Sequence, residues 1–181
     1  TNEGFRSYYS IDLPIISETN TLKNTLIFSN YYEYLNNTIL KSSFYFKNSS
    51  SITGDDVKLS ERVYLPSNRL RGFESGKVGP KDGNDFIGGN YSATFNAQTN
   101  IPKIFQNFQN LDAVIFFDAG SLWGVDYDSS LDDGGKLRSS IGVGVDWFTA
   151  IGPLNFTLSE VITKEDNDIT EGFRFNLGTT F

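Results

Sequence analysis

The charged residues of two short motifs are the side chains in this sequence best suited to specific chemistry. Arg69 and Arg71 lie in the segment RLRGF, within a long stretch rich in Gly, and Asp118 lies in the apolar segment FFDAG. On the polar face of a strand, a buried carboxylate without a partner is costly. A guanidinium can bind a carboxylate through two parallel hydrogen bonds, so we predict that Arg71 pairs with Asp118. The alternative interpretation of RLRGF is an ordinary solvated loop.

The residue inventory excludes most catalytic and metal chemistry. The sequence contains no His and no Cys, which removes a Ser-His-Asp triad, zinc–thiolate sites and disulfide bonds. The acidic residues Asp126, Asp128, Asp132 and Asp133 lack the central Gly and closing Glu of an EF-hand loop, so we expect a solvated loop there. The DAG motif occurs once, whereas an aspartic protease needs two such carboxylates side by side, so only a homodimer could supply the second. We therefore predict no metal, no cofactor and no enzyme activity.

Charge and composition narrow the class of protein further. The net charge of −7 argues against nucleic-acid binding, and the 15% of aromatic residues excludes a disordered chain. No run approaches the roughly 18 apolar residues of a membrane-spanning helix. A transmembrane barrel needs only alternate apolar residues, so its average hydropathy can resemble that of a water-soluble protein. The sequence contains no Met, and we expect it to begin inside a longer gene product or after processing.

Alternation of apolar and polar residues recurs in eight segments and predicts eight strands. One face of each strand carries Phe, Leu, Ile, Val and Ala, and the other carries Asp, Arg, Asn, Ser, Thr and Gly. Most segments approach the roughly 9–11 residues of a tilted membrane-spanning strand. The predicted strands are Phe5–Ile15, Leu22–Tyr34, Thr38–Lys47, Asn90–Gln98, Leu111–Ala119, Leu137–Trp147, Leu154–Ser159 and Phe173–Phe181.

The connections between these strands alternate in length. Short turns are expected at Leu35–Asn37 and Thr149–Gly152, whereas Asn48–Gly88 is long and polar. Outer-membrane barrels have short periplasmic turns and longer outer loops, which places the loop at about 48–88 on the extracellular side. The fold class predicted for residues 1–181 is therefore all-β, an antiparallel up-and-down transmembrane β-barrel of eight strands. A soluble β-sandwich is the competing fold.

Several segments, in the right order and spacing, resemble the outer-membrane insertase superfamily. RLRGF is similar to its V/I-R-G-F loop motif, FFDAGSLWG to its F-x-D-x-G strand, and EGFRFNLGTTF to its final strand. The resemblance covers about Arg69 to Phe181. Because the family barrel has sixteen strands, the resemblance implies that these eight are its C-terminal half. It also implies that the first eight strands and periplasmic repeat domains belong to a longer protein.

The resemblance implies roles for two groups of residues. Arg71 would hold the loop inside the barrel against Asp118, and a family Glu that joins this contact is replaced by the neutral Gln98. The last strand resembles the signal by which insertases recognise their substrates, although a terminal aromatic can also arise by chance. The implied loop motif is Arg69, Arg71, Gly72 and Phe73, and the implied strand signal is Phe173, Phe175, Leu177 and Phe181.

The function implied by the resemblance is the folding and insertion of other outer-membrane β-barrels. The implied partners are the lipid bilayer, the lipoproteins of an assembly complex and unfolded outer-membrane proteins, and this piece alone is expected to be inactive. The alternative function is that of a free-standing eight-strand outer-membrane barrel with a structural or adhesion role.

Eight strands taken from sixteen would leave two open edges, which cannot face lipid. Either the first and last strands pair, or a homodimer of two copies completes a sixteen-strand ring. We favour self-closure because it needs no partner. An eight-strand lumen is filled by its own side chains, so we expect the loop to lie outside it and the Arg71–Asp118 pair to be absent in this chain alone.

Overall fold

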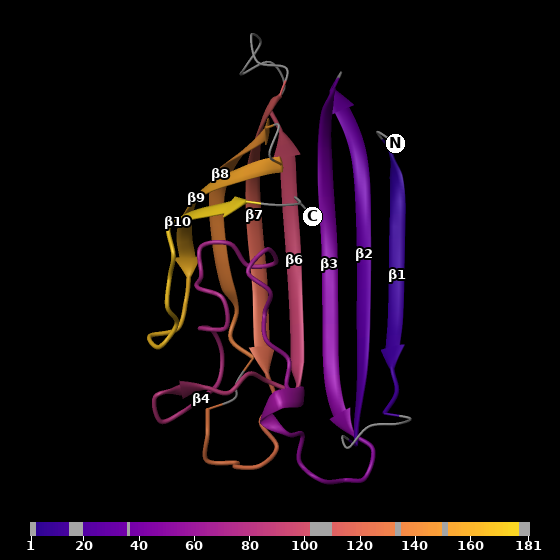
Figure 1. Cartoon of the computed structure of the whole chain (residues 1–181), viewed down its shortest axis with the longest axis vertical. Helices are drawn as coiled ribbons and strands as arrows, with labels where there is room; N and C mark the ends of the chain where they lie inside the picture. Colours follow the sequence, from indigo (N-terminus) through magenta and orange to yellow (C-terminus); the bar gives the residue numbers. More distant parts are fainter. Residues whose placement is uncertain are drawn as a thin grey trace.

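The fold is dominated by one curved antiparallel sheet. The computed structural model describes residues 3–14, 20–35, 37–101, 110–132, 135–149 and 152–177. Within these residues, eight strands pair in the order β1-β2-β3-β6-β7-β8-β9-β10 (Figure 1). The strands are β1 (Gly4–Asp12), β2 (Thr21–Leu35), β3 (Thr38–Ser51), β6 (Tyr91–Asn100), β7 (Leu111–Trp123), β8 (Arg138–Thr149), β9 (Gly152–Thr163) and β10 (Phe173–Leu177).

The predicted all-β class and up-and-down strand order are confirmed within the described residues. Each strand of the sheet is antiparallel to its neighbour along the chain. The predicted ends of the first and last strands, Ile15 and Phe181, lie outside the described residues. No helix in the described part of the chain is long and apolar enough to cross a membrane.

The two faces of the sheet differ in chemistry, as the alternation predicts. On the outer face Phe28 lies opposite Phe44, and Phe44 lies opposite Phe95; all three side chains are exposed. On the inner face Asn96 lies opposite Asp118, and Asp118 lies opposite Ser140. An apolar outer face and a polar inner face are the arrangement of a barrel wall in a membrane.

The long connection between β3 and β6 supplies the core that the polar inner face lacks. It contains a 3-10 turn, η1 (Leu59–Glu61), and a short hairpin of β4 (Lys81–Asp82) and β5 (Asp85–Phe86). In Figure 1 this loop lies in front of β7 and β8. Its apolar side chains form one buried cluster with a residue of β7; the cluster is Val63, Leu65, Leu70, Phe73, Val78 and Leu122.

The prediction that the first and last strands close an eight-strand barrel is wrong for this structure. In the described part of the chain, β1 and β10 lie at opposite ends of the sheet order. The expectation that the loop lies outside the lumen is also wrong, because its residues are buried against the inner face. An eight-strand lumen has room only for side chains, so a sheet that holds this loop must remain wider.

The outer face leads to a prediction about its centre. Phe117 points outward near the middle of β7 and is 37% exposed. We expect Phe117→Arg to destabilise the protein in lipid vesicles by about 2–4 kcal/mol, because a cation at the bilayer midplane loses its hydration. The measurement is urea unfolding followed by tryptophan fluorescence.

The matched control is Leu137→Arg, at an exposed residue just before β8. Near the membrane interface the same change is expected to cost only about 0–1 kcal/mol. Equal costs at the two positions would contradict a lipid-facing outer surface.

Candidate functional site

The site is centred on Asp118, a fully buried carboxylate in the middle of β7. The loop brings Arg71 to it, and Arg71 donates from its main-chain N at 3.0 Å and from Nε at 2.7 Å to Oδ2 of Asp118. Its Nη2 donates to Oδ1 at 2.8 Å. The predicted two-pronged pair is therefore present. The expectation that it would be absent from this chain is wrong, because the open sheet admits the loop.

Side chains of the two neighbouring strands complete the surroundings of this pair. Asn96 of β6 donates from Nδ2 to Oδ1 of Asp118 at 2.8 Å and to the carbonyl of Arg69 at 2.7 Å. Ser140 of β8 donates from Oγ to the carbonyl of Arg71 at 2.5 Å. Neither residue is predicted from the sequence as part of the site. The available signal was their position on the polar faces of their strands.

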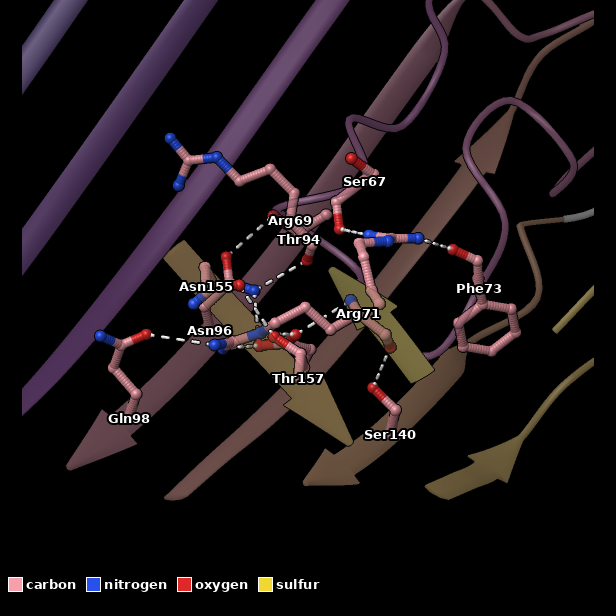
Figure 2. A network of polar contacts seen from close by, with 12 residues as sticks. Ser67, Arg69, Arg71, Phe73, Thr94, Asn96, Gln98, Ser140, Asn155 and Thr157 are labelled. Carbon is pink, nitrogen blue, oxygen red and sulfur yellow. Dashed lines mark hydrogen bonds and ion pairs between the residues drawn. The ribbon is translucent and has the colours of Figure 1, made fainter. Parts of the chain in front are cut away.

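Gln98, at the position where the resemblance implies a Glu, contacts the arginine. Nη1 of Arg71 donates to Oε1 of Gln98 at 3.4 Å (Figure 2). An amide oxygen accepts this hydrogen bond without adding a second negative charge. The guanidinium of Arg71 is therefore held by one buried carboxylate and one neutral acceptor.

The ring of Phe116 supports the guanidinium of Arg71, and Gly142 leaves room for that ring. The guanidinium of Arg71 lies 3.5 Å from the centroid of the Phe116 ring, a favourable position for a cation. Gly142 of β8 lies opposite Phe116. A Cβ at this glycine would lie 2.5 Å from the ring and 2.2 Å from the carbonyl oxygen of Leu158. The missing side chain therefore lets the ring approach β8 closely.

The last two residues of the loop motif have clear packing roles. Gly72 has a φ of +90°, and a Cβ there would lie 3.2 Å from the Cβ atoms of Ser140 and Ser159. Both its backbone conformation and this close approach favour glycine. The Phe73 side chain is 1% exposed and belongs to the buried apolar cluster.

Arg69 points away from the buried pair. Figure 2 shows its side chain extending away from Arg71, and its Nη1 donates to Oγ of Ser43 at 3.4 Å. It lines a cavity of about 960 Å³ together with Arg6 and Lys41. Within the described residues, none of these three cations has a carboxylate partner. The inner surface beside the loop is therefore positively charged in a chain that is negative overall.

Asp126 is exposed, as the prediction of a solvated acidic loop requires, but it also binds the start of the long loop. Its Oδ2 accepts from the main-chain N of Val57 at 2.9 Å and from Nδ2 of Asn90 at 2.8 Å, and its Oδ1 accepts from Arg62. Burial acts to raise the pKa of Asp126, but these donors outweigh burial and hold the pKa below its usual value. The contact is expected to weaken only when the pH falls through that lowered pKa.

The remaining acidic residues are exposed or outside the described part. Asp128 binds Ser130, and Asp132 pairs with Lys136; Asp133 lies outside the described residues. Among the residues that the structure describes, no group of three or more His, Cys, Asp or Glu is placed to hold a metal ion.

Two further arginines bind partners on the inner side of the last strands, and neither role is predicted from the sequence. Arg138 of β8 donates to both carboxylate oxygens of Asp168, at 2.8 and 3.1 Å, and both side chains are buried. Arg174 of β10 donates to the carbonyls of Ser67 and Phe73 in the loop. Alternation placed Arg174 on the polar face, but its partners are backbone atoms that no sequence motif marks.

The residues of the implied strand signal lie on the outer face. Phe173, Phe175 and Leu177 are exposed, and the Phe175 ring lies 5.1 Å from that of Phe156 on β9. Phe181 lies outside the described residues. A recognition role for these residues stays a prediction.

Comparison with known proteins decides the family. The model of the Omp85 superfamily domain matches residues 2–181. The chain belongs to the Omp85 superfamily. Its resemblance to the outer-membrane insertases is thereby confirmed at the level of the family.

Three relatives of this Omp85 chain are named as outer membrane protein assembly factor BamA or as BamA. The factor from Neorickettsia risticii is 29% identical over 132 residues, or 71% of this chain, and that from Neisseria meningitidis is 32% identical over 139 residues, or 62%. The crystal structure of BamA from Haemophilus ducreyi lacking POTRA domains 1-3 superposes with a TM-score of 0.83 at 25% identity and covers 96% of this chain.

The Omp85 chain spans only part of these relatives. It covers 18% and 17% of the lengths of the two curated relatives and 38% of the crystallised BamA chain. The relatives are outer-membrane proteins of Gram-negative bacteria, and membership places this chain in the outer membrane.

The close packing of Gly142 against Phe116 leads to a prediction for this Omp85 chain. We expect Gly142→Val to destabilise the protein by about 1–3 kcal/mol, because the new side chain overlaps the Phe116 ring and the β9 backbone. The displaced ring would loosen Arg71. The measurements are the temperature at which the folded band is lost on a gel and protease cleavage of the loop.

The control is Gly135→Ala, because a Cβ at Gly135 approaches no heavy atom closer than 3.5 Å. It is expected to leave both measurements unchanged. Loop cleavage that stays at the wild-type rate in Gly142→Val would show that the ring does not support the arginine.

Proposed function

We propose that this chain is the C-terminal half of the barrel of an outer-membrane insertase that folds and inserts other outer-membrane proteins, without enzymatic chemistry. The observation that carries the proposal is the RLRGF loop held by Arg71 on Asp118 inside an open sheet. The BamA relatives are named as assembly factors, which supports the same activity here. In this proposal residues 1–181 are one barrel domain whose loop at about 48–88 enters the lumen from the extracellular side.

The free ends of the sheet support a mechanism by strand pairing. In the described part of the chain, β1 and β10 each have one neighbouring strand, so each presents unpaired backbone groups. Such an edge can accept another extended segment through main-chain hydrogen bonds. In a membrane the edges must be completed by further strands. We propose that strands elsewhere in the same protein, and transiently those of a substrate, complete them.

The proposed partners follow from this arrangement. They are the lipid bilayer at the outer face, unfolded outer-membrane proteins at the edge, and the lipoproteins of an assembly complex. Phe173, Phe175, Leu177 and Phe181 are proposed to form the signal of the final strand. The free-standing eight-strand barrel requires β1 to pair with β10, and no observation in the described residues favours it.

The chain by itself is expected to be inactive, because its lone edges lack the strands that would complete a barrel. The measurement is the folding rate of a substrate barrel in liposomes that contain this chain, compared with empty liposomes. The full-length protein that contains the chain serves as the positive control. Faster folding with the chain alone would contradict its proposed status as half of a machine.

The buried ion pair gives a functional test in the full-length protein. Arg71→Ala is expected to impair assembly of outer-membrane proteins, since removal of one partner of a buried pair typically costs about 3–5 kcal/mol. Arg71→Lys is also expected to be harmful, because an ammonium lacks the planar fork. The measurements are growth and the amount of folded outer-membrane proteins in a strain that depends on the variant.

The decisive comparison is the charge swap Arg71→Asp with Asp118→Arg. If the pair acts through its opposite charges, each single change impairs growth and the swap restores part of it. The control is Arg69→Gln, because Arg69 makes no ion pair within the described residues. Wild-type growth of both single variants at the pair would contradict the role of this contact in assembly.

A further inference from the structure

Arg174 joins the end strand of the sheet to the loop. It lies on β10, and its side chain is 12% exposed. Its Nη1 donates to the carbonyl of Ser67 at 2.7 Å, and its Nη2 donates to the carbonyl of Phe73 at 2.6 Å. These two carbonyls lie on either side of the turn that carries Arg71. The guanidinium of Arg174 therefore bridges the two segments that flank Arg71 in the loop tip, residues 66–74.

An ion pair holds this guanidinium in place. Its Nε donates to Oε2 of Glu171 at 2.8 Å. Glu171 lies in the segment just before β10, and its own main-chain N donates to the carbonyl of Gly72 at 2.9 Å. The same residue thus balances the charge of Arg174 and binds the loop backbone. Hydrogen bonds from a charged donor are the stronger ones.

The backbone before β10 pairs with the loop over several residues. The main-chain N of Glu74 donates to the carbonyl of Ile169 at 2.9 Å, and that of Ile169 donates to the carbonyl of Lys77 at 3.0 Å. Phe73 and Thr170 form an antiparallel bridge. The paired segment continues directly into β10, so movement of that strand acts on the loop.

The two arginines fasten the loop at different places in the sheet. Arg71 fixes it to Asp118 in the middle of β7, and Arg174 fixes it to the end strand. In the described part of the chain, β10 pairs only with β9, over five residue pairs. The described part of β10 is therefore in contact with both β9 and the loop.

We propose that Arg174 is a positioning residue that couples the RLRGF loop to the end strand β10, so that the two are released together. Displacement of β10 must break the bonds to Ser67 and Phe73 and so loosens the loop tip. Coupling between two equilibria is reciprocal, so loss of the Arg71 anchor also loosens β10. This inference concerns the fold and does not depend on the proposed insertase role.

Hydrogen exchange of backbone amides in the full-length protein, held in lipid nanodiscs, tests the coupling. Arg174→Ala is expected to raise exchange at residues 66–74 by about tenfold, the factor that corresponds to the loss of charged hydrogen bonds. Arg71→Ala is expected to raise exchange both there and in β10. If Arg174 transmits the effect, Arg71→Ala raises amide exchange in β10 less in the Arg174→Ala background than in the wild-type protein. A merely structural role of Arg174 would not give this result.

The matched control is Arg6→Ala, at an arginine on β1 that lines the same cavity but makes no ion pair within the described residues. It is expected to leave exchange in the loop and in β10 unchanged. The proposal is overturned if Arg174→Ala behaves like Arg6→Ala in the loop, or if Arg71→Ala leaves β10 unchanged. If Arg174→Ala does not fold, Arg174→Lys decides: raised loop exchange supports the coupling, and wild-type exchange overturns it.

Discussion

The buried carboxylate of Asp118 is the constraint on which the rest of the structure depends. Its side chain is completely shielded from solvent, so its charge requires a cation and hydrogen-bond donors within the protein. Arg71 and Asn96 supply them. Because Arg71 lies on a loop, satisfying this carboxylate draws the loop onto the inner face. The position of the loop then determines how far the sheet can close.

The loop covers the inner face of this sheet, as a second layer of secondary structure covers a sheet in a soluble protein. The inner face carries polar residues and cannot form an apolar core by itself. The loop brings its own apolar side chains, which pack on Leu122 of β7, and its backbone accepts hydrogen bonds from Ser140 and Arg174. The main chain of the loop therefore satisfies these two polar side chains of the inner face. An antiparallel wall with lipid outside and a polar interior can tolerate such a plug.

Much of the fold follows from the sequence because it depends on local alternation. The period of two in Leu111–Ala119 is enough to place Phe117 outside and Asp118 inside, and the same pattern locates the eight strands of the main sheet. The choice of Arg71 as the partner of Asp118 also follows from the sequence, since a buried carboxylate requires a cation. The expectation that the pair would be absent from this chain is wrong, because the open sheet admits the loop. Closure could not be predicted in this way, because it depends on the volume that the loop occupies.

The sequence by itself determined the strands, their two faces and the motif residues Arg71, Gly72 and Asp118. Only the tertiary structure decided the contacts of Arg174 and Gly142. Arg174 binds backbone carbonyls, which every residue possesses and which therefore leave no mark in the sequence. Gly142 is required by the ring on a neighbouring strand. Alternation reports which face a side chain takes, but the space and the partners on that face depend on segments that are distant in the chain.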